Sequence, residues 1–252
     1  ALALYFCPRL GLFKGLYYSV FHSVSAFCNA GFDLMGAETP FSSLTAEAGN
    51  WYLNLVIMAL IVIGGLGFFV WLDLLDSRFR FKNLRLHSKI VVFMTAVLLA
   101  GGALGLFLLE LTGEAYEGMS LGDRILASLF QSVTVRTAGF NTVDLAALRE
   151  GSIFLMICLM VVGGSTGSTA GGMKTTTAAV LVLSIFSTFR QKKNVECFKR
   201  RLEDGITRTA SCIFMMYLIL IILSTLVLSA AEGIPVLTAM FETTSAIATV
   251  GV

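Results

Sequence analysis

Three short segments of this sequence share a pattern of residue types that suits the coordination of ions. They are FHSVSAFCNAGF (residues 21–32), FQSVTVRTAGF (130–140) and FETTSAIATVGV (241–252), and we call them the three glycine segments. Each begins with Phe and a polar residue, continues through Ser and Thr, and ends with a glycine and an apolar residue. Glycine permits backbone angles that turn carbonyl oxygens toward one axis, where rings of carbonyls can replace the hydration shell of an alkali cation.

The glycines of the three segments, Gly31, Gly139 and Gly251, are 108 and 112 residues apart, and each could bring backbone carbonyls to an ion path. The alternative is three interfacial or re-entrant helices that end in glycine caps and bind no ion. One such segment would favour that alternative, but three at near-equal spacing favour an ion path.

The composition indicates a membrane protein that must hold these segments. Hydrophobic residues make up 56% of the 252 residues, charged residues 13%, and the mean hydropathy is +0.84. A soluble domain carries about 25% charged residues, so a soluble fold is excluded. The predicted fold class is therefore an all-α polytopic membrane protein.

Four crossings are expected from the apolar runs, because a bilayer core of about 30 Å needs roughly 20 apolar residues in a helix. Three runs are long enough: Leu53–Leu72, Ile90–Leu109 and Ser211–Ala231. The stretch 152–189 is too long for one simple span and is interpreted as two apolar halves joined by a break rich in Gly, Ser and Thr. Gly64, Gly65 and Gly67 in the first run indicate close helix packing.

The charges predict the orientation of the chain. The segments 77–89 and 190–208 hold 12 of the 18 basic residues, including Lys193 and Lys199, and an even number of crossings separates them. The positive-inside rule places both in the cytoplasm. The opposite connections carry acids such as Glu38, Glu47 and Glu110, which could concentrate cations at an outer mouth or form ordinary solvated loops; we expect solvated loops.

The break in the third span carries GGSTGSTAGGMKTTT at residues 163–177. It nearly matches a nucleotide-binding P-loop, but Met173 occupies the position where that motif requires Lys, and an apolar run precedes it rather than a βαβ strand. ATP binding is therefore rejected. The remaining alternatives are a flexible kink for close helix packing and a functional element of the ion path.

The motifs CNAGF (28–32), TVRTAGFNTVD (134–144), GGSTGSTAGGMKTTT and ATVGV (248–252) resemble those of the Trk/Ktr/HKT superfamily, and most closely the bacterial Ktr-type potassium-translocating membrane subunit. The resemblance covers essentially the whole chain. It implies tandem membrane–pore–membrane repeats around a potassium-channel-like filter, with K⁺ as the transported ion, Na⁺ as a second candidate ion and no cofactor bound in this chain. It also implies a homodimer in the lipid of the bacterial cytoplasmic membrane, regulated by cytosolic nucleotide-binding subunits and without a nucleic-acid partner.

Four repeats would surround the filter in that family. The resemblance implies that the filter carbonyls belong to Asn29, Ala30 and Gly31, to Thr137, Ala138 and Gly139, and to Thr249, Val250 and Gly251. Residues 1–76 would be a partial second repeat, with pore helix and filter near 16–32 and inner helix at 51–76. Residues 77–189 would be the third, with filter 134–141 and a broken inner helix at 151–189. Residues 190–252 would be a partial fourth repeat ending in its filter. We therefore expect a fragment that lacks the first repeat and the last inner helix.

The resemblance also assigns a role to the break, as an intramembrane gate beneath the filter. The gate residues would be Gly163, Gly164, Ser165, Thr166, Gly167, Ser168, Thr169, Ala170, Gly171, Gly172 and Lys174. Arg136 could pair with Glu242 on a neighbouring pore helix and brace the filter. Lys174 could lower cation occupancy or anchor the loop, and a structural ion pair is the expected role for both cations.

Two rival functions come from other classes. A secondary transporter would bind its substrate at the broken third span, but it predicts inverted repeats, whereas these three share one orientation. An enzyme would need ionisable residues inside the bundle, and the spans carry almost none. The five scattered cysteines and two histidines suggest neither a disulfide framework nor a zinc site. We therefore expect no enzyme and no catalytic residue.

Overall fold

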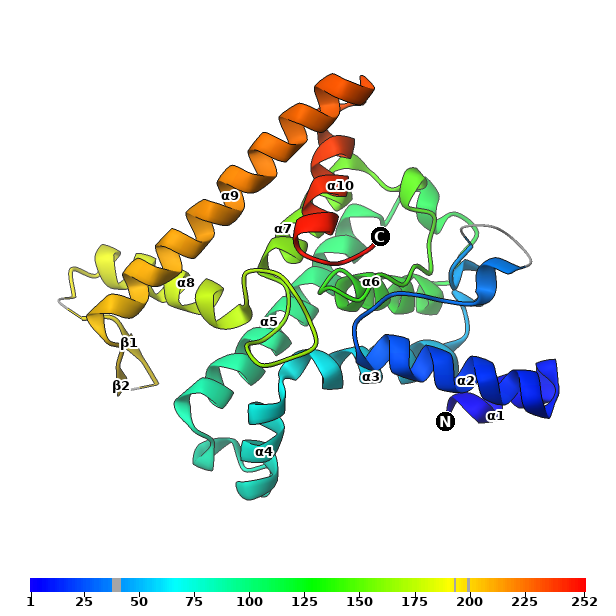
Figure 1. Ribbon diagram of the computed structural model, residues 1–252, viewed down its shortest axis with the longest axis horizontal. Coiled ribbons are helices and arrows are strands. Elements are labelled where there is room, and N and C mark those ends of the chain that lie inside the picture. The colour runs from blue at the N-terminus through cyan, green and yellow to red at the C-terminus, as the bar shows by residue number, and fades with distance from the viewer. Residues whose placement is uncertain (38–41, 193, 199) are drawn as a thin grey trace.

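The computed structural model describes residues 1–37, 42–192, 194–198 and 200–252, and nearly all of its regular structure is helical (Figure 1). Glu38, Lys193 and Lys199 lie outside the described residues. The α-helices are α1 (Leu2–Leu10), α2 (Leu12–Phe27), α3 (Trp51–Leu66), α4 (Phe68–Asp76), α5 (Leu86–Leu109), α6 (Leu121–Thr134), α7 (Glu150–Val162), α8 (Thr175–Phe189), α9 (Asp204–Glu232) and α10 (Val236–Ile247). Short 3₁₀ turns are η1 (Met35–Ala37), η2 (Thr45–Glu47), η3 (Phe81–Asn83), η4 (Glu114–Tyr116) and η5 (Leu145–Ala147), and β1 (Glu196–Cys197) pairs with β2 (Arg200–Arg201) in an antiparallel hairpin.

Among the described residues, two helices are long and apolar enough to cross a membrane unbroken. They are α5 and α9, of 24 and 29 residues, and they confirm the second and fourth predicted spans. Large apolar side chains are exposed along α9, among them Met216, Leu223 and Val227. Such a surface is unfavourable in water and suits contact with lipid.

The first predicted span is not one straight helix, which corrects the prediction. The helix α3 ends at Leu66, and α4 begins at Phe68 at an angle of 93° to it. Gly67 between them has φ 97° and ψ 143°, a conformation that residues with a side chain rarely adopt. The bend turns the second half of this apolar run away from the first.

The third predicted span is broken as expected. The helices α7 and α8, of 13 and 15 residues, are each shorter than a bilayer crossing. Residues 163–174 between them form an irregular segment, which we call the glycine loop; in Figure 1 it is the open yellow-green loop near the centre.

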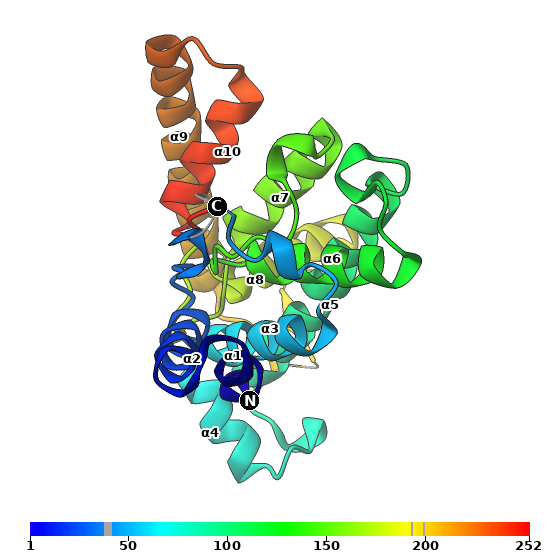
Figure 2. The same cartoon turned by 90° about the vertical axis from the view of Figure 1, so that its right-hand side faces the viewer.

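The three glycine segments begin on the short helices α2, α6 and α10. The middle one, α6, lies at the centre of the protein, because its side chains enter both large apolar clusters. Leu126 and Phe130 pack with α1, α2 and α3, whereas Ala127 packs with α5, α7 and α10. Figure 2 shows α9 and α10 side by side along one edge, with α1 and α2 lower on the same side.

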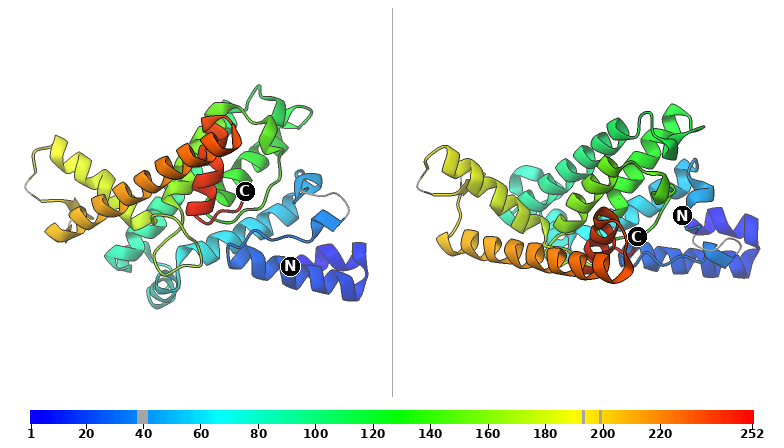
Figure 3. Two further views of the ribbon diagram at one scale, coloured as in Figure 1. Left: turned by 45° about the horizontal axis from the view of Figure 1, so that its top comes forward. Right: turned by 90° about the horizontal axis from the view of Figure 1, so that it is seen from above.

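The two basic segments meet at one end of the molecule, as the charge pattern predicts. The ring of Phe198 in the β1–β2 hairpin contacts that of Phe81 in η3, with 6.0 Å between centroids. The connections that contain η2 and η4 lie at the opposite end from the hairpin (Figure 3).

Candidate functional site

Each glycine segment is closed by the same side-chain hydrogen bond. A hydroxyl near the end of each short helix donates to the carbonyl of the residue after the glycine. The pairs are Ser25 Oγ to Phe32 O (2.6 Å), Thr134 Oγ1 to Phe140 O (2.6 Å) and Ser245 Oγ to Val252 O (3.2 Å). The sequence interpretation missed these three hydroxyls, although each stands four residues after the initial Phe of its segment.

The backbone of each segment repeats a second bond. The residue before each glycine donates its amide to the carbonyl of the hydroxyl-bearing residue. These bonds are Ala30 N to Ser25 O (2.9 Å), Ala138 N to Thr134 O (2.8 Å) and Val250 N to Ser245 O (2.8 Å). The middle segment makes this bond across one residue fewer, so all three backbones fold alike despite its shorter sequence.

Backbone handedness alternates along the three carbonyl-bearing residues of each segment. The first residue has positive φ in every copy: 52° at Asn29, 72° at Thr137 and 57° at Thr249. The glycines have positive φ as well, and the residue between has negative φ. This alternation departs from an extended strand, in which every residue has negative φ. A side chain at positive φ is strained, so the repeated strain marks these positions as candidates for function.

The glycines bring the three segments into direct contact. A Cβ added to Gly31 would lie 2.9 Å from the Cα of Gly139, and it would also meet the carbonyl of Ala138. A Cβ on Gly139 would lie 3.2 Å from the Cα of Gly31 and would meet the carbonyl of Val250. The middle segment therefore lies between the other two, and no side chain fits at Gly139.

The glycine loop lies against all three segments at their positive-φ residues. Thr169 Oγ1 is 3.0 Å from both Phe27 O and Asn29 Oδ1, and the amide of Gly171 donates to Thr137 Oγ1 over 3.0 Å. A Cβ on Gly171 would lie 2.6 Å from Ala248 O and would also meet Thr249 Oγ1. The loop therefore covers one end of the glycine segments.

Bonds within the loop hold it in a compact shape. The amide of Gly164 donates to Gly171 O over 3.1 Å, and the amide of Thr175 returns to Gly164 O over 2.8 Å. The Lys174 ammonium donates to Ala170 O over 2.6 Å. Lys174 therefore bonds to a carbonyl of the loop itself, and the described residues show no ion pair at Lys174, where one was expected.

Comparisons with known proteins identify the family. The family model described as "TrkH: Cation transport protein" matches residues 9–252. This chain belongs to the TrkH family of cation transport proteins.

Relatives agree with that family. The chain is 40% identical over 255 residues to the Potassium/sodium uptake protein NtpJ of Enterococcus hirae, covering 100% of this chain and 55% of that protein. It is 38% identical to the Ktr system potassium uptake protein B of Bacillus subtilis, covering 97% and 54%. The chain therefore spans about half the length of the curated relatives it matches.

A solved structure shares the fold. The potassium transporter TrkH from Vibrio parahaemolyticus superposes with a TM-score of 0.69, at 22% identity, over 94% of this chain and 49% of that one. The TrkH fold and the exposed apolar helices together make this chain part of a polytopic membrane protein.

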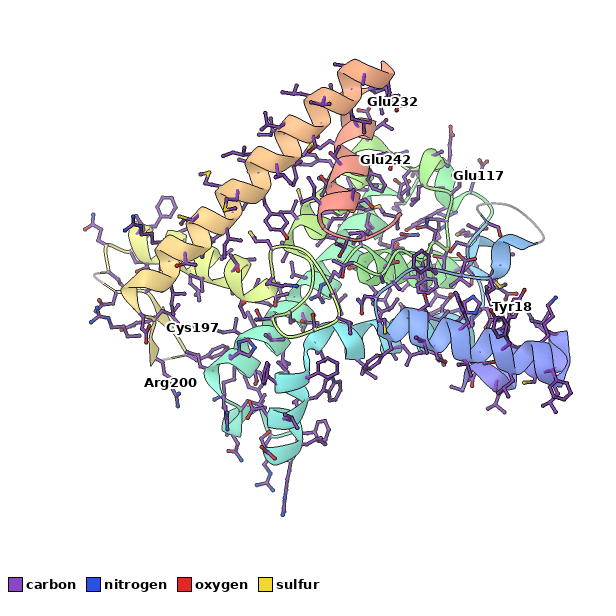
Figure 4. The ribbon with its side chains drawn as sticks, in the orientation of Figure 1. Tyr18, Glu117, Cys197, Arg200, Glu232 and Glu242 are labelled. Atoms are coloured by element: carbon purple, nitrogen blue, oxygen red, sulfur yellow. The ribbon has the colours of Figure 1, made fainter. Side chains whose placement is uncertain are left out.

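Within the described part of the chain, Arg136 makes no ion pair, although one with Glu242 was expected. Its guanidinium is buried, and it donates to Gly163 O (3.3 Å) and toward Thr95 Oγ1 (3.5 Å). Glu242 lies exposed on α10 (Figure 4), and the described residues show no ion pair between the two. The expectation failed because Arg136 points toward α5 and the start of the glycine loop.

The polar residue after each initial Phe has three different environments. His22 is buried, with Nδ1 2.7 Å from Tyr18 O and Nε2 accepting the amide of Leu34 over 3.3 Å. Gln131 is buried without a side-chain partner among the described residues, and Glu242 is exposed. These positions do not converge on one common site.

Proposed function

We propose that this chain forms part of a potassium-translocation path across the bacterial cytoplasmic membrane. The carbonyls of residues 29–31, 137–139 and 249–251 would form its filter, and the glycine loop would be its gate. The observation that carries the proposal is the convergence of three segments with the same two hydrogen bonds and the same alternation of φ.

Dehydration is the physical task of such a filter. An alkali cation leaves its water only when oxygen dipoles replace it, and backbone carbonyls aimed to one side supply them. The backbone alternation repeated in the three segments would turn several such oxygens toward one axis. Once in the path, each ion would be driven by the membrane potential with about 2.3 kcal/mol per 100 mV.

The position of the glycine loop supports the role of a gate. The loop touches all three segments on one side, so an ion that passes the filter would have to displace it. Its glycines allow such a movement, because they adopt many backbone conformations. A substrate site at the same break has less support, since the amides of Ser165, Thr169 and Gly171 are all bonded to the protein.

The wider assembly is also proposed. Residues 1–76, 77–189 and 190–252 would be the second, third and fourth repeats, and the remainder of a longer subunit would complete the filter. The complete subunit would act as a homodimer with cytosolic nucleotide-binding regulatory subunits, and Na⁺ would influence or accompany the transport of K⁺. The names of the two relatives, which include potassium and sodium uptake, support this choice of ions.

Uptake by the complete subunit tests the proposal. It would be expressed in a cell that lacks its own potassium transport, and growth and Rb⁺ uptake would be measured at low potassium. We expect rescue of growth and saturable Rb⁺ uptake. A well-expressed, membrane-inserted subunit that restores neither would contradict the proposal.

A further inference from the structure

The bend between α3 and α4 leaves carbonyl oxygens that no helical amide can reach. The last turn of a helix always has such groups, and within a membrane they must be bonded inside the protein. Three of them have donors from outside α3. Trp71 Nε1 donates to Ile63 O (2.8 Å), the amide of Thr169 to Gly64 O (3.4 Å) and the amide of Ser165 to Gly65 O (3.1 Å).

The glycine loop provides two of these donors and also accepts one bond in return. The first amide of α4, at Phe68, donates to Gly167 O over 3.0 Å. The joint at Gly67 and the glycine loop also approach closely, since a Cβ on Gly67 would lie 2.8 Å from Thr166 O. Residues 64–68 and 165–169 are therefore joined by three backbone hydrogen bonds.

The carbonyls of Gly64 and Gly65 could instead accept hydrogen bonds within a straight helix. In a continuous helix through residue 67, Gly64 O would accept from the amide of Phe68 and Gly65 O from that of Phe69, in the ordinary i to i−4 pattern. Bending therefore exchanges helical bonds for bonds to the loop, and straightening reverses the exchange. Neither arrangement leaves the carbonyls of Gly64 and Gly65 unpaired.

We infer that Gly67 is the positioning residue of a switch in which the bent α3–α4 joint holds the glycine loop against the glycine segments and the straightened joint releases it. The inference rests on the proposed function, because it assigns a control to the proposed gate. A continuous helix over residues 51–76 would be about 39 Å long at 1.5 Å per residue, enough to cross the bilayer core. Straightening would remove three of the bonds that hold the loop.

A reversible cross-link tests whether the docked loop blocks transport. A Cβ on Gly65 would lie 4.0 Å from the Cβ of Ala170, within the range of about 3.5–4.5 Å for a disulfide. The complete subunit would carry Gly65→Cys and Ala170→Cys after its native cysteines are replaced, including the five described here. In vesicles, oxidation should reduce Rb⁺ flux at least about tenfold and reduction should restore it, since a disulfide in good geometry forms a covalent lock. Gly65→Cys alone, under the same oxidation, is the control.

A second set of variants tests the bend itself. Gly67→Ala places a side chain at φ 97° and so favours the straight helix. On the cysteine pair it should slow disulfide formation about fivefold, and without the pair it should raise Rb⁺ flux by a similar factor, because a side chain at positive φ is strained in the bent joint. Trp71→Phe removes the indole donor to Ile63 O without a backbone change, and it should act in the same direction with a smaller effect.

Gly101→Ala is the matched control for the glycine substitution. Gly101 lies within α5, has no heavy atom within 4 Å of an added Cβ and does not adopt positive φ, so both readouts should stay within about twofold of the parent. Cross-linking that is unchanged in both Gly67→Ala and Trp71→Phe would overturn the switch. If cross-linking is slowed as expected but Rb⁺ flux does not respond to the disulfide, the exchange of hydrogen bonds at the bend stands. The proposed gate is then overturned.

Discussion

Two kinds of apolar helix occur in this chain, and they differ in where their backbone bonds go. The helices α5 and α9 run unbroken and satisfy their own amides and carbonyls, and α9 exposes apolar side chains along its length. The α3–α4 and α7–α8 pairs are interrupted, and the groups released at the breaks bond to each other. Lipid offers no hydrogen bond, so a broken backbone at membrane depth must lie inside protein or against water.

The two breaks form one hydrogen-bonded unit. The break at Gly67 supplies carbonyls, and the glycine loop supplies amides that reach them. The glycine segments form the third part, because the same loop contacts Asn29 and Thr137 on its other side. Substitutions in this unit should therefore change transport, whereas matched substitutions in the unbroken helices should not.

The largest effect is expected at Gly139. Gly139→Ala puts a Cβ against the carbonyl of Val250 at φ 85°, so the contact between the glycine segments must open. The strained φ and the steric overlap each cost about 1–3 kcal/mol. A loss of at least about 1.4 kcal/mol at one position of the proposed filter should lower the preference for K⁺ over Na⁺ at least about tenfold. Competitive uptake of Rb⁺ and Na⁺ measures it, and Gly101→Ala in α5 is the control. An unaltered preference in a folded Gly139→Ala variant would remove Gly139 from the filter.

A smaller effect is expected where the loop meets the third glycine segment. Gly171→Ala would press against Thr249 Oγ1 and would lie 2.6 Å from Ala248 O, which disfavours the docked loop. Rb⁺ uptake should rise about threefold to fivefold for a steric cost near 1 kcal/mol, with ion preference retained. Flux assays on the complete subunit would check both quantities. Equal uptake in variant and parent would show that this contact does not hold the loop.

A substitution at Thr169 should weaken the docking of the loop by a smaller amount. Thr169→Val keeps the shape of the side chain but removes the hydroxyl that lies 3.0 Å from Phe27 O and Asn29 Oδ1. A net hydrogen bond contributes about 1 kcal/mol, so uptake should rise about twofold to fivefold at most. Thr177→Val on α8, outside the loop, is the matched control. A decrease in uptake would mean that the hydroxyl assists passage rather than docking.

The smallest effect is expected outside both kinds of span, in the connection that contains η2. The Arg9 guanidinium is 2.6 Å from Glu47 Oε1, but its side chain is 55% exposed. Exposed ion pairs contribute about 0.2–1 kcal/mol, so Glu47→Gln should lower thermal stability only slightly and leave transport unchanged. A transport defect in Glu47→Gln would give this connection a role in the ion path.

The stability that Glu47 contributes should depend on pH in one direction. Burial alone would raise the pKa of Glu47, but hydrogen bonds from Tyr5, Asn50 and Arg9 outweigh it and hold this pKa below the ordinary value of 4.5. Its contribution to stability is therefore complete above about pH 4.5 and declines as the pH falls through the lowered pKa. Melting temperatures of parent and Glu47→Gln should converge on acidification. A gap that widens as the pH falls would contradict this assignment.

Much of the arrangement could be predicted because it follows local rules. Apolar length predicted α5 and α9, and the run of glycines after Val162 predicted the break in the third span. The bend at Gly67 was missed because glycines are common in membrane helices, and Gly64, Gly65 and Gly67 were interpreted as positions of close helix packing. Its partners lie about 100 residues away in the sequence, at Ser165, Gly167 and Thr169.

The contacts of single polar side chains were also beyond sequence reasoning. Arg136 was expected to find an acid, but the fold places it beside Gly163 O and Thr95 Oγ1. Charge alone favours a carboxylate, whereas the partner that forms is set by which element packs against α6. The hydroxyls of Ser25, Thr134 and Ser245, in contrast, share one offset and were open to prediction.

The most direct test of the ion path is to locate bound ions in crystals of the complete subunit. Anomalous diffraction from crystals soaked in Rb⁺ or Tl⁺ would show where a potassium analogue sits. We expect density on the common axis of the three glycine segments, beside the carbonyls of residues 29–31, 137–139 and 249–251. Ion density elsewhere, with none beside these carbonyls, would contradict it.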